Sequence, residues 1–594
     1  MAPYCNVVPF YLLLTILAIE VRGLSASLSS VNQSTWNAFS KSINGRLHNG
    51  RPMMAPCYLN YNGKSQIPDL GQCLKLQGSQ LDSVFISDHF GGYQNDIWAS
   101  CQETGQGCTM STLLNDNSSP PFLGSCMQGS VPSKYVEVTS VDDVQKSLRF
   151  ATEHNLRVVI KNTGHDYKGR SSAPDSFALW MHNYQPPIKL ETNFTADGCT
   201  APAGNVVTFG AGQEFQGIYD FAHAHNVRVV GGTSSSVGAA GGWITGGGHS
   251  MLSNEFGLGV DNVQQLRAVL PNGTYITANR CQNQDIFYAL RGGGGGTFGV
   301  IMEMSTLAHP EKPMEVAQVT LANINRQSMR EFISILVSNS DRWSSEGWGG
   351  YIQLGAVGNA LVSFVMATSM LDHSQATASM QPVLDFAREA GFQLQANITS
   401  APNYYDILGK MITAPSGSVA LSSRIVPRQL FVENPTGLTS IIEELVFDTP
   451  GDGSLGLSPL LICFTTPALY SKNLPVSDQP GGPGEASVTP AWRDGLWHAI
   501  HIRLSTGLLT NSASTWKSVH EAINPLREFT PGSGAYQNEA DPFEPDPAAT
   551  FWGEAHYGRL SQIKKMVDPS NILTVHQGIG WDATDDRYRC YPNV

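Results

Sequence analysis

A strand–helix–strand order that occurs twice between residues 135 and 230 restricts the fold of this chain more than any other feature. Residues 135–138 and 156–160 form short apolar runs typical of strands, and a capping-box pattern at 140–143 predicts that a helix begins between them. The order returns with a strand at 206–209, a helix at 214–225 and a strand at 227–230. Strands that alternate with helices at this spacing indicate an α/β layer architecture.

The pattern of apolar runs changes after a glycine-dense stretch at residues 231–299. The runs 316–321, 329–337, 350–354 and 360–366 open a mixed sheet-and-helix section of about 200 residues, which is a candidate second domain. A helix is expected at 515–523, followed by turn-rich and aromatic sequence. Residues 24–130, by contrast, are rich in loops and in cysteine.

Composition excludes one large class of proteins. The 594 residues contain 36 Lys and Arg against 49 Asp and Glu, which gives a net charge of −13 and no block of basic residues. Such a chain lacks the electrostatic footprint of a nucleic-acid-binding protein. Hydrophobic residues make up 41%, enough for an extensive core.

The N-terminus indicates export. Residues 7–19 form an apolar run closed by Glu20 and Arg22, which is too short to span a membrane and typical of a secretory signal peptide cleaved after Gly23, or after Ala26. A buried N-terminal helix or strand is the alternative, because no Lys or Arg precedes the run. No later segment is apolar enough to span a membrane. Sequons for N-glycosylation, which agree with a secreted or secretory-pathway protein, occur at Asn32, Asn117, Asn193, Asn272 and Asn397.

Nine cysteines remain after removal of such a signal peptide. An odd number requires at least one free thiol or an intermolecular bond. Cys463 lies within the apolar run 460–464, so we expect it to be buried and free. No C-x-x-C pair occurs, and the near-match to a zinc-protease helix at His520 has Asn524 in place of the second histidine, so no metal site is expected.

Three glycine-rich segments give the strongest indication of function in the sequence. The first, 160–172, follows a strand, and its Gly164 and Gly169 allow a tight turn whose amide groups form a nest for a pyrophosphate. The second, 234–250, lets a flat ligand approach the backbone. The third, 285–300, satisfies G-x-G-x-x-G, yet residues 300–304 read as a strand, which excludes the dinucleotide-binding helix. An ordinary turn, a tightly packed loop and a surface loop are the respective alternatives.

Taken together, these segments resemble the berberine-bridge-enzyme-like group of the vanillyl-alcohol oxidase and p-cresol methylhydroxylase flavoproteins, in its secreted fungal, isoamyl-alcohol-oxidase-like branch. The resemblance extends from about residue 50 to the C-terminus. It rests on ordered motifs at 162–172, 246–249, 257–262, 536–541, 551–553 and 568–571.

The resemblance implies FAD attached through a histidine to the methyl group at ring position 8, and the matching residue is His165. Doubly linked relatives add a cysteine, but Ser234 stands in its place and cannot form a thioether, so a single covalent bond through His165 is expected. That bond requires a neutral imidazole. The resemblance places the following residues at the cofactor: His165, Lys161, Asn162, Thr163, Gly164, Asp166, Gly169, Arg170, Ser171, Ser236, Val237, Gly238, Gly242, Gly246, Gly247, Gly248, Asp261, Val300 and Asn538.

The catalytic candidates that the resemblance implies are Tyr536 and Glu539. Tyr536 matches the tyrosine of a Tyr-x-Asn motif, whereas Glu539 replaces the second tyrosine of the family and is either the base or, as we favour, a surface carboxylate. Trp243, His249, His576 and Gln577 are further pocket candidates, for which a core or surface role is the alternative.

The resulting fold prediction is a mixed α+β and α/β chain, with a two-subdomain p-cresol-methylhydroxylase-type FAD-binding domain and a substrate domain built on an antiparallel sheet with flanking helices. The expected boundaries are a signal peptide at 1–23, an N-terminal segment at 24–129, an FAD-binding domain at 130–308, a substrate domain at 309–529 and a returning C-terminal segment at 530–594.

The predicted function is a secreted monomeric oxidase. It transfers a hydride from an alcohol, amine or activated carbon of a small organic molecule, a natural-product intermediate in the first instance, to FAD, with dioxygen as acceptor and hydrogen peroxide as product. A carbohydrate or short-chain alcohol oxidase and an inactive flavin-binding protein are the alternatives. A secreted hydrolase is a further rival, disfavoured because no G-x-S-x-G motif occurs.

Overall fold

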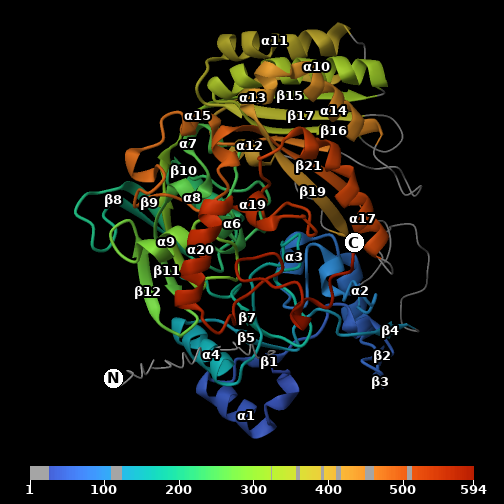
Figure 1. The fold of residues 1–594 in the computed structure, drawn as a ribbon, viewed down its shortest axis with the longest axis vertical. Coiled ribbons are helices and arrows are strands. Elements are labelled where there is room, and N and C mark those ends of the chain that lie inside the picture. The colour runs from blue at the N-terminus through green and yellow to red at the C-terminus, as the bar shows by residue number, and fades with distance from the viewer. Residues whose placement is uncertain are drawn as a thin grey trace, which may run out of the picture.

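The structure is a computed structural model and describes residues 26–108, 124–322, 324–355, 361–389, 393–409, 417–448, 460–504 and 512–594 (Figure 1). The expected signal peptide at 1–23 and the sequon at Asn117 lie outside these ranges. The four other sequon asparagines, Asn32, Asn193, Asn272 and Asn397, are exposed. Among the described helices, none combines the length and the apolar character needed to cross a bilayer.

The predicted first strand–helix–strand unit is present. Strand β5 (Lys134–Glu137) leads to helix α4 (Val141–Glu153), which begins at a capping box in which Ser140 and Asp143 each bind the other's backbone amide. Val144, Leu148 and Ala151 of α4 are fully buried, as their helical spacing predicts. Strand β6 (Val158–Lys161) follows, and β5 and β6 both lie parallel to β7 (Phe177–Trp180) in a four-stranded sheet completed by β1 (Leu47–Asn49).

Of the second predicted unit, only the first strand belongs to a five-stranded antiparallel sheet, which has the order β12-β11-β13-β9-β8. Its strands are β8 (Lys189–Phe194), β9 (Gly204–Gly210), β11 (Val263–Val269), β12 (Tyr275–Asn279) and β13 (Val300–Leu307). Helix α5 (Phe215–Ala224) follows β9 in the chain, and helix α9 (Gln284–Leu290) lies beside β12. The glycine run after α9 leads into strand β13, which confirms that it does not open a helix. The strand expected at 227–230 is shorter: β10 (Val227–Arg228) pairs only with β14 (His309–Pro310).

A seven-stranded antiparallel sheet forms the upper part of the molecule in Figure 1. Its order is β18-β15-β17-β16-β20-β21-β19, with the bounds β15 (Met314–Ala322), β16 (Gly349–Leu354), β17 (Leu361–Thr368), β18 (Gln393–Ala401), β19 (Val419–Pro427), β20 (Leu460–Phe464) and β21 (Gly495–Leu504). Helices α10 (Arg326–Ser345), α11 (His373–Glu389) and α14 (Pro435–Phe447) pack one face, in a core where Phe332 and Leu336 meet Ile352 and Phe364. The other face is left to form part of the site.

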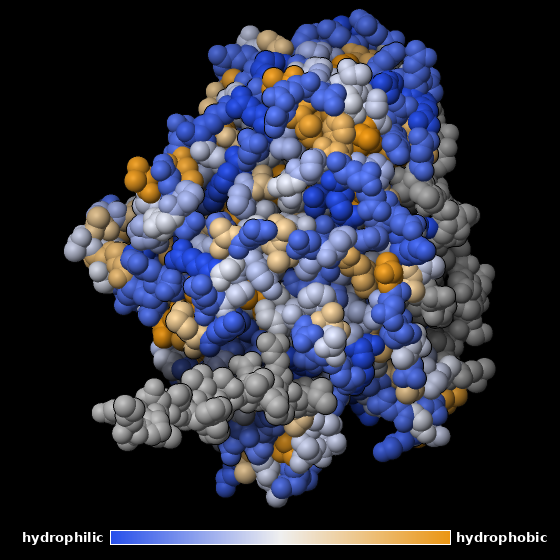
Figure 2. Space-filling model, viewed as in Figure 1, coloured by the Kyte–Doolittle hydropathy of each residue, from blue (hydrophilic) through white to orange (hydrophobic). Residues whose placement is uncertain are grey.

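The remaining helices are short or lie near the chain ends. They are α1 (Gln33–Ser42), α2 (Leu70–Gly78), α3 (Ser83–Ser87), α6 (Ile244–Gly246), α7 (Ser253–Phe256), α8 (Gly259–Asn262), α12 (Tyr405–Leu408), α13 (Arg428–Glu433), α15 (Ala468–Ser471), α16 (Ala491–Asp494), α17 (Ser512–Ala522), α18 (Asn524–Phe529), α19 (Pro547–Phe551) and α20 (Glu554–Val567). A small three-stranded sheet in the N-terminal segment contains β2 (Asn60–Tyr61), β3 (Lys64–Ser65) and β4 (Ser125–Cys126). The face shown in Figure 2 is mostly hydrophilic, with hydrophobic residues singly or in small groups.

The C-terminal segment packs against the glycine-rich part of the chain. The side chains of Gln537 and Trp552 both donate hydrogen bonds to the carbonyl of Gly292, at 2.6 and 2.9 Å. A disulfide joins Cys590 to Cys101 in the N-terminal segment. These contacts agree with a returning C-terminal segment, whose exact domain boundaries stay a prediction.

Eight cysteines form four disulfides, Cys57–Cys73, Cys101–Cys590, Cys108–Cys126 and Cys199–Cys281. Cys463 is free and buried, as its apolar surroundings predict.

Candidate functional site

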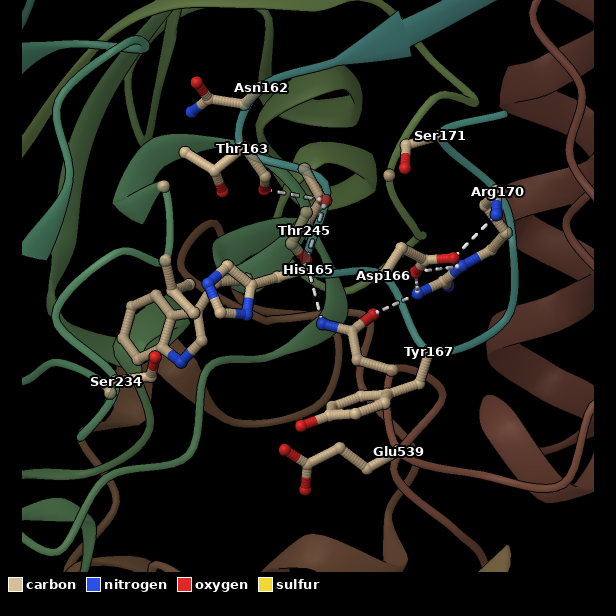
Figure 3. A pocket seen from close by; sticks show the side chains of 18 of the residues that line it. Asn162, Thr163, His165, Asp166, Tyr167, Arg170, Ser171, Ser234, Thr245 and Glu539 are labelled. Atoms are coloured by element: carbon tan, nitrogen blue, oxygen red, sulfur yellow. Dashed lines mark hydrogen bonds and ion pairs between the residues drawn. The ribbon is translucent and has the colours of Figure 1, made fainter. Parts of the chain in front are cut away.

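A cavity of about 340 Å³ lies between the glycine-rich segments and the open face of the seven-stranded sheet. Figure 3 shows the part formed by the first glycine-rich segment, with His165 above Glu539 and the paired Asp166 and Arg170 to one side. The predicted residues that line this cavity are Asn162, Thr163, Gly164, His165, Asp166, Arg170, Ser171, Val237, Gly238, Gly242, Val300, Tyr536, Asn538 and Glu539. The sheet contributes Tyr351, Gln353, Val419, Leu421, Leu461, Cys463, Ile500 and Ile502.

The first glycine-rich segment is held by its own charged pair. Gly164 and Gly169 adopt positive φ angles of 84° and 72°, which glycine accepts readily. Between them, the carboxylate of Asp166 accepts hydrogen bonds from the backbone amides of Lys168 and Arg170 and pairs with the Arg170 guanidinium. Arg170 also donates to the Asn538 amide oxygen at 2.8 Å. The turn is thereby fixed to the C-terminal segment.

His165 occupies the centre of this segment as a neutral imidazole. Its Nε2 atom lies 2.7 Å from the hydroxyl oxygen of Ser236, on the second glycine-rich segment. Burial, and then the nearby Lys161 ammonium, lower the pKa of His165 to about 3. The ring therefore has a free lone pair at neutral pH, which is what attachment to a flavin methyl group requires.

The glycines of the second segment form an open wall that fits a flat cofactor. A Cβ placed on Gly241 or Gly242 would meet no atom within 4 Å, so bare backbone borders the cavity there. Gly238, in contrast, packs so closely on the Asn162 amide that a side chain would clash. The bare backbone of this wall, together with the polar side chains of the first segment that line the cavity, fits FAD.

Seven predicted cofactor residues do not border the cavity: Lys161, Gly169, Ser236, Gly246, Gly247, Gly248 and Asp261. Asp261 instead forms a bidentate pair with Arg493, both contacts at 2.7 Å, and caps α8 through the amide of Leu258. Gly169 and Gly248 are packed against the Trp98 and Trp243 rings, and Gly246 against Asn538. Ser236 contacts His165, which lines the cavity. Of the seven, Ser236, Gly246 and Gly248 contact side chains that line the cavity.

Lys161 has the most unusual surroundings of these seven residues. Its side chain is fully buried, its ammonium has no hydrogen-bond partner among the described residues, and the rings of Phe90, Tyr93 and Trp180 surround it at 5.1–5.9 Å. Burial lowers the pKa of Lys161 to about 7.

Glu539 is not a surface carboxylate, and that interpretation was wrong. Its side chain is 21% exposed and lines the cavity, where Oε2 accepts hydrogen bonds from Nε2 of His249, at 3.0 Å, and Nε2 of His498, at 2.9 Å. Burial opposes its ionisation, but the two histidines hold the pKa of Glu539 well below its ordinary range. Oε1 accepts no hydrogen bond from the described residues, so the site presents an ionised carboxylate with one unengaged oxygen.

Tyr536 lies beside this group with a different character. Its hydroxyl accepts a hydrogen bond from the Asn538 amide at 2.8 Å and donates to the Trp243 carbonyl at 3.5 Å. Burial, reinforced by the charge of Glu539, raises the pKa of Tyr536 above its ordinary value. Among the described residues, no carboxylate or imidazole accepts a hydrogen bond from this hydroxyl, so the phenol keeps its proton and is a poor proton acceptor.

The His249, His498 and Glu539 ligand atoms lie within 4.8 Å of one another, a spacing that a metal ion also accepts. Two observations favour a hydrogen-bonded group. Both histidines approach the same carboxylate oxygen at hydrogen-bond distance, and neither Nδ1 atom has a partner in the described chain. A metal-bound imidazole normally has its second nitrogen held by an acceptor.

Sequence reasoning missed His498 and the sheet residues. His498 belongs to β21, 41 residues before Glu539, and only the alternation of the strand indicates which face it occupies. Of the further candidates, Trp243 and His249 line the cavity. His576 and Gln577 do not: His576 stacks on Tyr591 at 3.7 Å, and Gln577 accepts a hydrogen bond from Lys168, so both have core roles.

Fold and site together define a flavoprotein: glycine-rich loops on a two-sheet half, a neutral histidine that lines the cavity, and a separate antiparallel sheet over the cavity. Family models described as "FAD binding domain" and "Berberine and berberine like" match residues 132–279 and 535–580. FAD-linked oxidoreductase ffsJ of Aspergillus flavipes is 33% identical over 597 residues, covering 94% of each chain.

Solved structures agree. The VAO-type flavoprotein MtVAO615 of Myceliophthora thermophila is 26% identical with a TM-score of 0.77, covering 94% of this chain and 98% of that one. BBE-like 1 of Physcomitrella patens shares the fold, with 19% identity, a TM-score of 0.61 and coverage of 76% and 92%. The chain belongs to the berberine-bridge-enzyme-like family of FAD-linked oxidoreductases, which confirms the predicted fold class, the cofactor FAD and the assignment as an enzyme.

Proposed function

We propose that this protein is a secreted, glycosylated oxidase with FAD bound through His165 alone. It takes a hydride from the carbon that carries an alcohol or amine group in a small organic molecule of natural-product type, and dioxygen accepts the electrons to give hydrogen peroxide. Glu539 carries this proposal, because it lines the cavity in which the substrate would meet the flavin and its Oε1 accepts no hydrogen bond from the described residues.

Glu539 is the proposed proton acceptor. Removal of a hydride from an alcohol or amine carbon requires that the attached O–H or N–H lose its proton to a positioned base. Oε2 is held by His249 and His498, so the carboxylate cannot rotate freely, and Oε1 is left to take the proton. The two imidazole donors stabilise the ionised form before the reaction.

Tyr536 is a positioning residue in this proposal. Its raised pKa and its hydrogen bonds to Asn538 and Trp243 give it no route to accept a proton at neutral pH. Through Asn538 it is joined to Arg170 and to the Gly242 carbonyl. This chain of contacts fixes the C-terminal segment against the cofactor wall.

FAD, when bound, supplies the hydride acceptor and the centre that reacts with dioxygen. The residues that would hold it are the glycine wall at 238–242, the segment around Asn162, Thr163 and Gly164, and His165 as the covalent tether. Ser234 lines the cavity but has no thiol, which supports a single link.

Secretion is supported by three features. Four disulfides are typical of an oxidising compartment, the four described sequon asparagines are exposed, and the N-terminal run fits a signal peptide.

The test is an absorbance spectrum of purified secreted protein, followed by a peroxide assay. We expect a flavin band that stays with the protein after denaturation, and rapid peroxide formation when photoreduced enzyme meets air. An alcohol and amine panel, tested for anaerobic bleaching of the band, then identifies the reacting group. A bound flavin that no compound reduces and that air does not reoxidise would contradict the oxidase and support an inactive flavin-binding protein.

A further inference from the structure

The open face of the seven-stranded sheet determines what the cavity can hold. Side chains two residues apart on a strand point to the same face. In register, Tyr351, Cys463 and His498 form one row across β16, β20 and β21. Because His498 binds Glu539, this row lies beneath the reacting end of the cavity.

The next row has a different character. Two residues further along the strands, Gln353 pairs with Leu461, and Leu461 with Ile500. Leu421 and Ile502, a register pair of β19 and β21, continue the apolar surface. We call Leu421, Leu461, Ile500 and Ile502 the apolar strip. It offers no polar side chain.

Gln353 is the exception at one edge of this strip. It lines the cavity, it is half-buried, and its amide forms no hydrogen bond with another residue of the described chain. Its register neighbour on β17 is Ser363, and the other polar member of this row, Ser423 of β19, pairs with Ile500 but is not part of the cavity lining. An amide with free donor and acceptor groups at the end of an apolar surface is a place where a ligand gains a directional contact.

The apolar strip disfavours a carbohydrate. Every sugar hydroxyl laid on this surface would lose water without gaining a partner, and each such group is costly to bury. An apolar body loses nothing there and gains from burial.

We propose that Gln353 determines the specificity of this cavity. The substrate is an apolar molecule that lies on the apolar strip, with its alcohol or amine at Glu539 and a carbonyl or similar acceptor at the Gln353 amide. The proposal rests on the proposed function only for which end of the molecule reacts.

The sheet geometry sets the length of such a molecule. Gln353 lies two residues along and two strands across from His498, which is roughly 12 Å between backbone positions for a rise of about 3.4 Å and a strand spacing of about 4.8 Å. A two-ring compound with a substituent at each end spans the space between the two side chains.

The experiment measures binding of three probes to the holoenzyme by flavin difference spectra and calorimetry. They are 2-naphthylmethanol carrying an acetyl group at position 6, the same compound carrying an isopropyl group there, and cellobiose. The two naphthyl probes have nearly the same shape and differ in one hydrogen-bond acceptor. We expect the acetyl probe to bind about fivefold more tightly than the isopropyl probe, the effect of one net hydrogen bond, and cellobiose at least tenfold more weakly than either.

Variants separate the amide from the surface around it. Gln353→Leu should abolish the preference for the acetyl probe, and Gln353→Glu, which offers only an acceptor, should abolish it too. Gln318→Leu is the matched control, because Gln318 lies on the same face of β15, outside the cavity lining. It should keep the wild-type preference.

The proposal would be overturned if the wild type bound the acetyl and isopropyl probes equally well, as expected when residue 353 is only a solvated rim residue. Loss of the preference for the acetyl probe in Gln318→Leu would overturn it too. So would a failure of the naphthyl probes to bind, or tighter binding of cellobiose than of the naphthyl probes. Binding that depends on Gln353, without flavin reduction by any alcohol or amine, would contradict the proposed function and leave this proposal standing.

Discussion

Nε2 of His165 lies 2.7 Å from the hydroxyl of Ser236, and this contact joins two glycine-rich segments 71 residues apart. With Nε2 engaged, Nδ1 is the ring nitrogen left for another bond. The ring is neutral because burial and Lys161 lower the pKa of His165 to about 3. The same two segments that form the proposed cofactor wall therefore also hold the proposed tether in its reactive, neutral form.

The first prediction concerns that tether. His165→Ala should yield protein whose FAD is released by acid precipitation, whereas wild-type FAD should stay in the pellet. Flavin fluorescence of pellet and supernatant measures the outcome. Ser234→Ala is the matched control and should retain its flavin, since no thioether involves residue 234. Covalent flavin in the His165→Ala pellet would show that another residue forms the bond.

A second prediction assigns the base. Glu539→Gln should slow anaerobic flavin reduction by a substrate by about 10²–10⁴-fold, the range typical of a lost general base. Reoxidation of dithionite-reduced enzyme by air should be unchanged, because it involves no substrate proton. Glu521→Gln, at an exposed position on α17, serves as control. Equal rates in the Glu539→Gln and wild-type enzymes would remove Glu539 from the mechanism.

The histidines beside Glu539 predict a shift in pH dependence. The base must be ionised, so flavin reduction is lost as the pH falls through its pKa, which His249 and His498 hold low. His498→Leu removes one donor and raises that pKa, so the acid limb of the rate profile should move to higher pH. His498→Gln, whose amide can still donate to the carboxylate, should restore part of the shift. An unmoved limb in His498→Leu would mean that His498 has only a packing role.

Features specified by neighbouring residues were predictable from the sequence. The capping box at Ser140 and Asp143 opens α4 because both partners lie within one turn. The strand after the glycine run and the buried thiol of Cys463 were also predictable, because each lies in an apolar run.

The environment of Glu539 was not predictable, for a physical reason. His249 is 290 residues before it and His498 is 41 before it, and only the packing of the sheet against the C-terminal segment brings the three together. Without those partners a lone carboxylate in a polar loop is best assigned to the surface. Likewise, a glycine in the sequence shows only that something lies close to the backbone. It does not show that Asn538 lies against Gly246 and Trp243 against Gly248, rather than a ligand.

The disulfide between Cys101 and Cys590 should contribute more stability than a local one. It joins positions 489 residues apart, whereas Cys57 and Cys73 are 16 apart. Loop closure alone gives about 6 and about 3 kcal/mol respectively, as upper values. The double variant Cys101→Ser/Cys590→Ser should therefore lower Tm more than Cys57→Ser/Cys73→Ser, in thermal unfolding followed by intrinsic fluorescence. An equal or smaller decrease would show that packing of the C-terminal segment holds it without the bond.

The final prediction concerns acid stability. His501 is 1% exposed, neither ring nitrogen has a hydrogen-bond partner in the described chain, and burial lowers its pKa to about 4. The unfolded chain binds this proton at about pH 6.5, whereas the folded chain resists it until about pH 4. Unfolding therefore becomes more favourable as the pH falls from 6.5 to 4, by about 3 kcal/mol from this residue at the lower limit.

His501→Leu removes the titrating group and leaves an apolar side chain in the same buried position. Its Tm should fall less steeply between pH 7 and pH 4 than that of the wild type, while a change at pH 7 reports packing alone. His223→Gln, on the exposed face of α5, should keep the wild-type slope. Parallel slopes for the wild type and His501→Leu would show that water reaches the imidazole in the folded state, since a hydrated ring titrates near its ordinary pKa in both states and contributes no pH dependence.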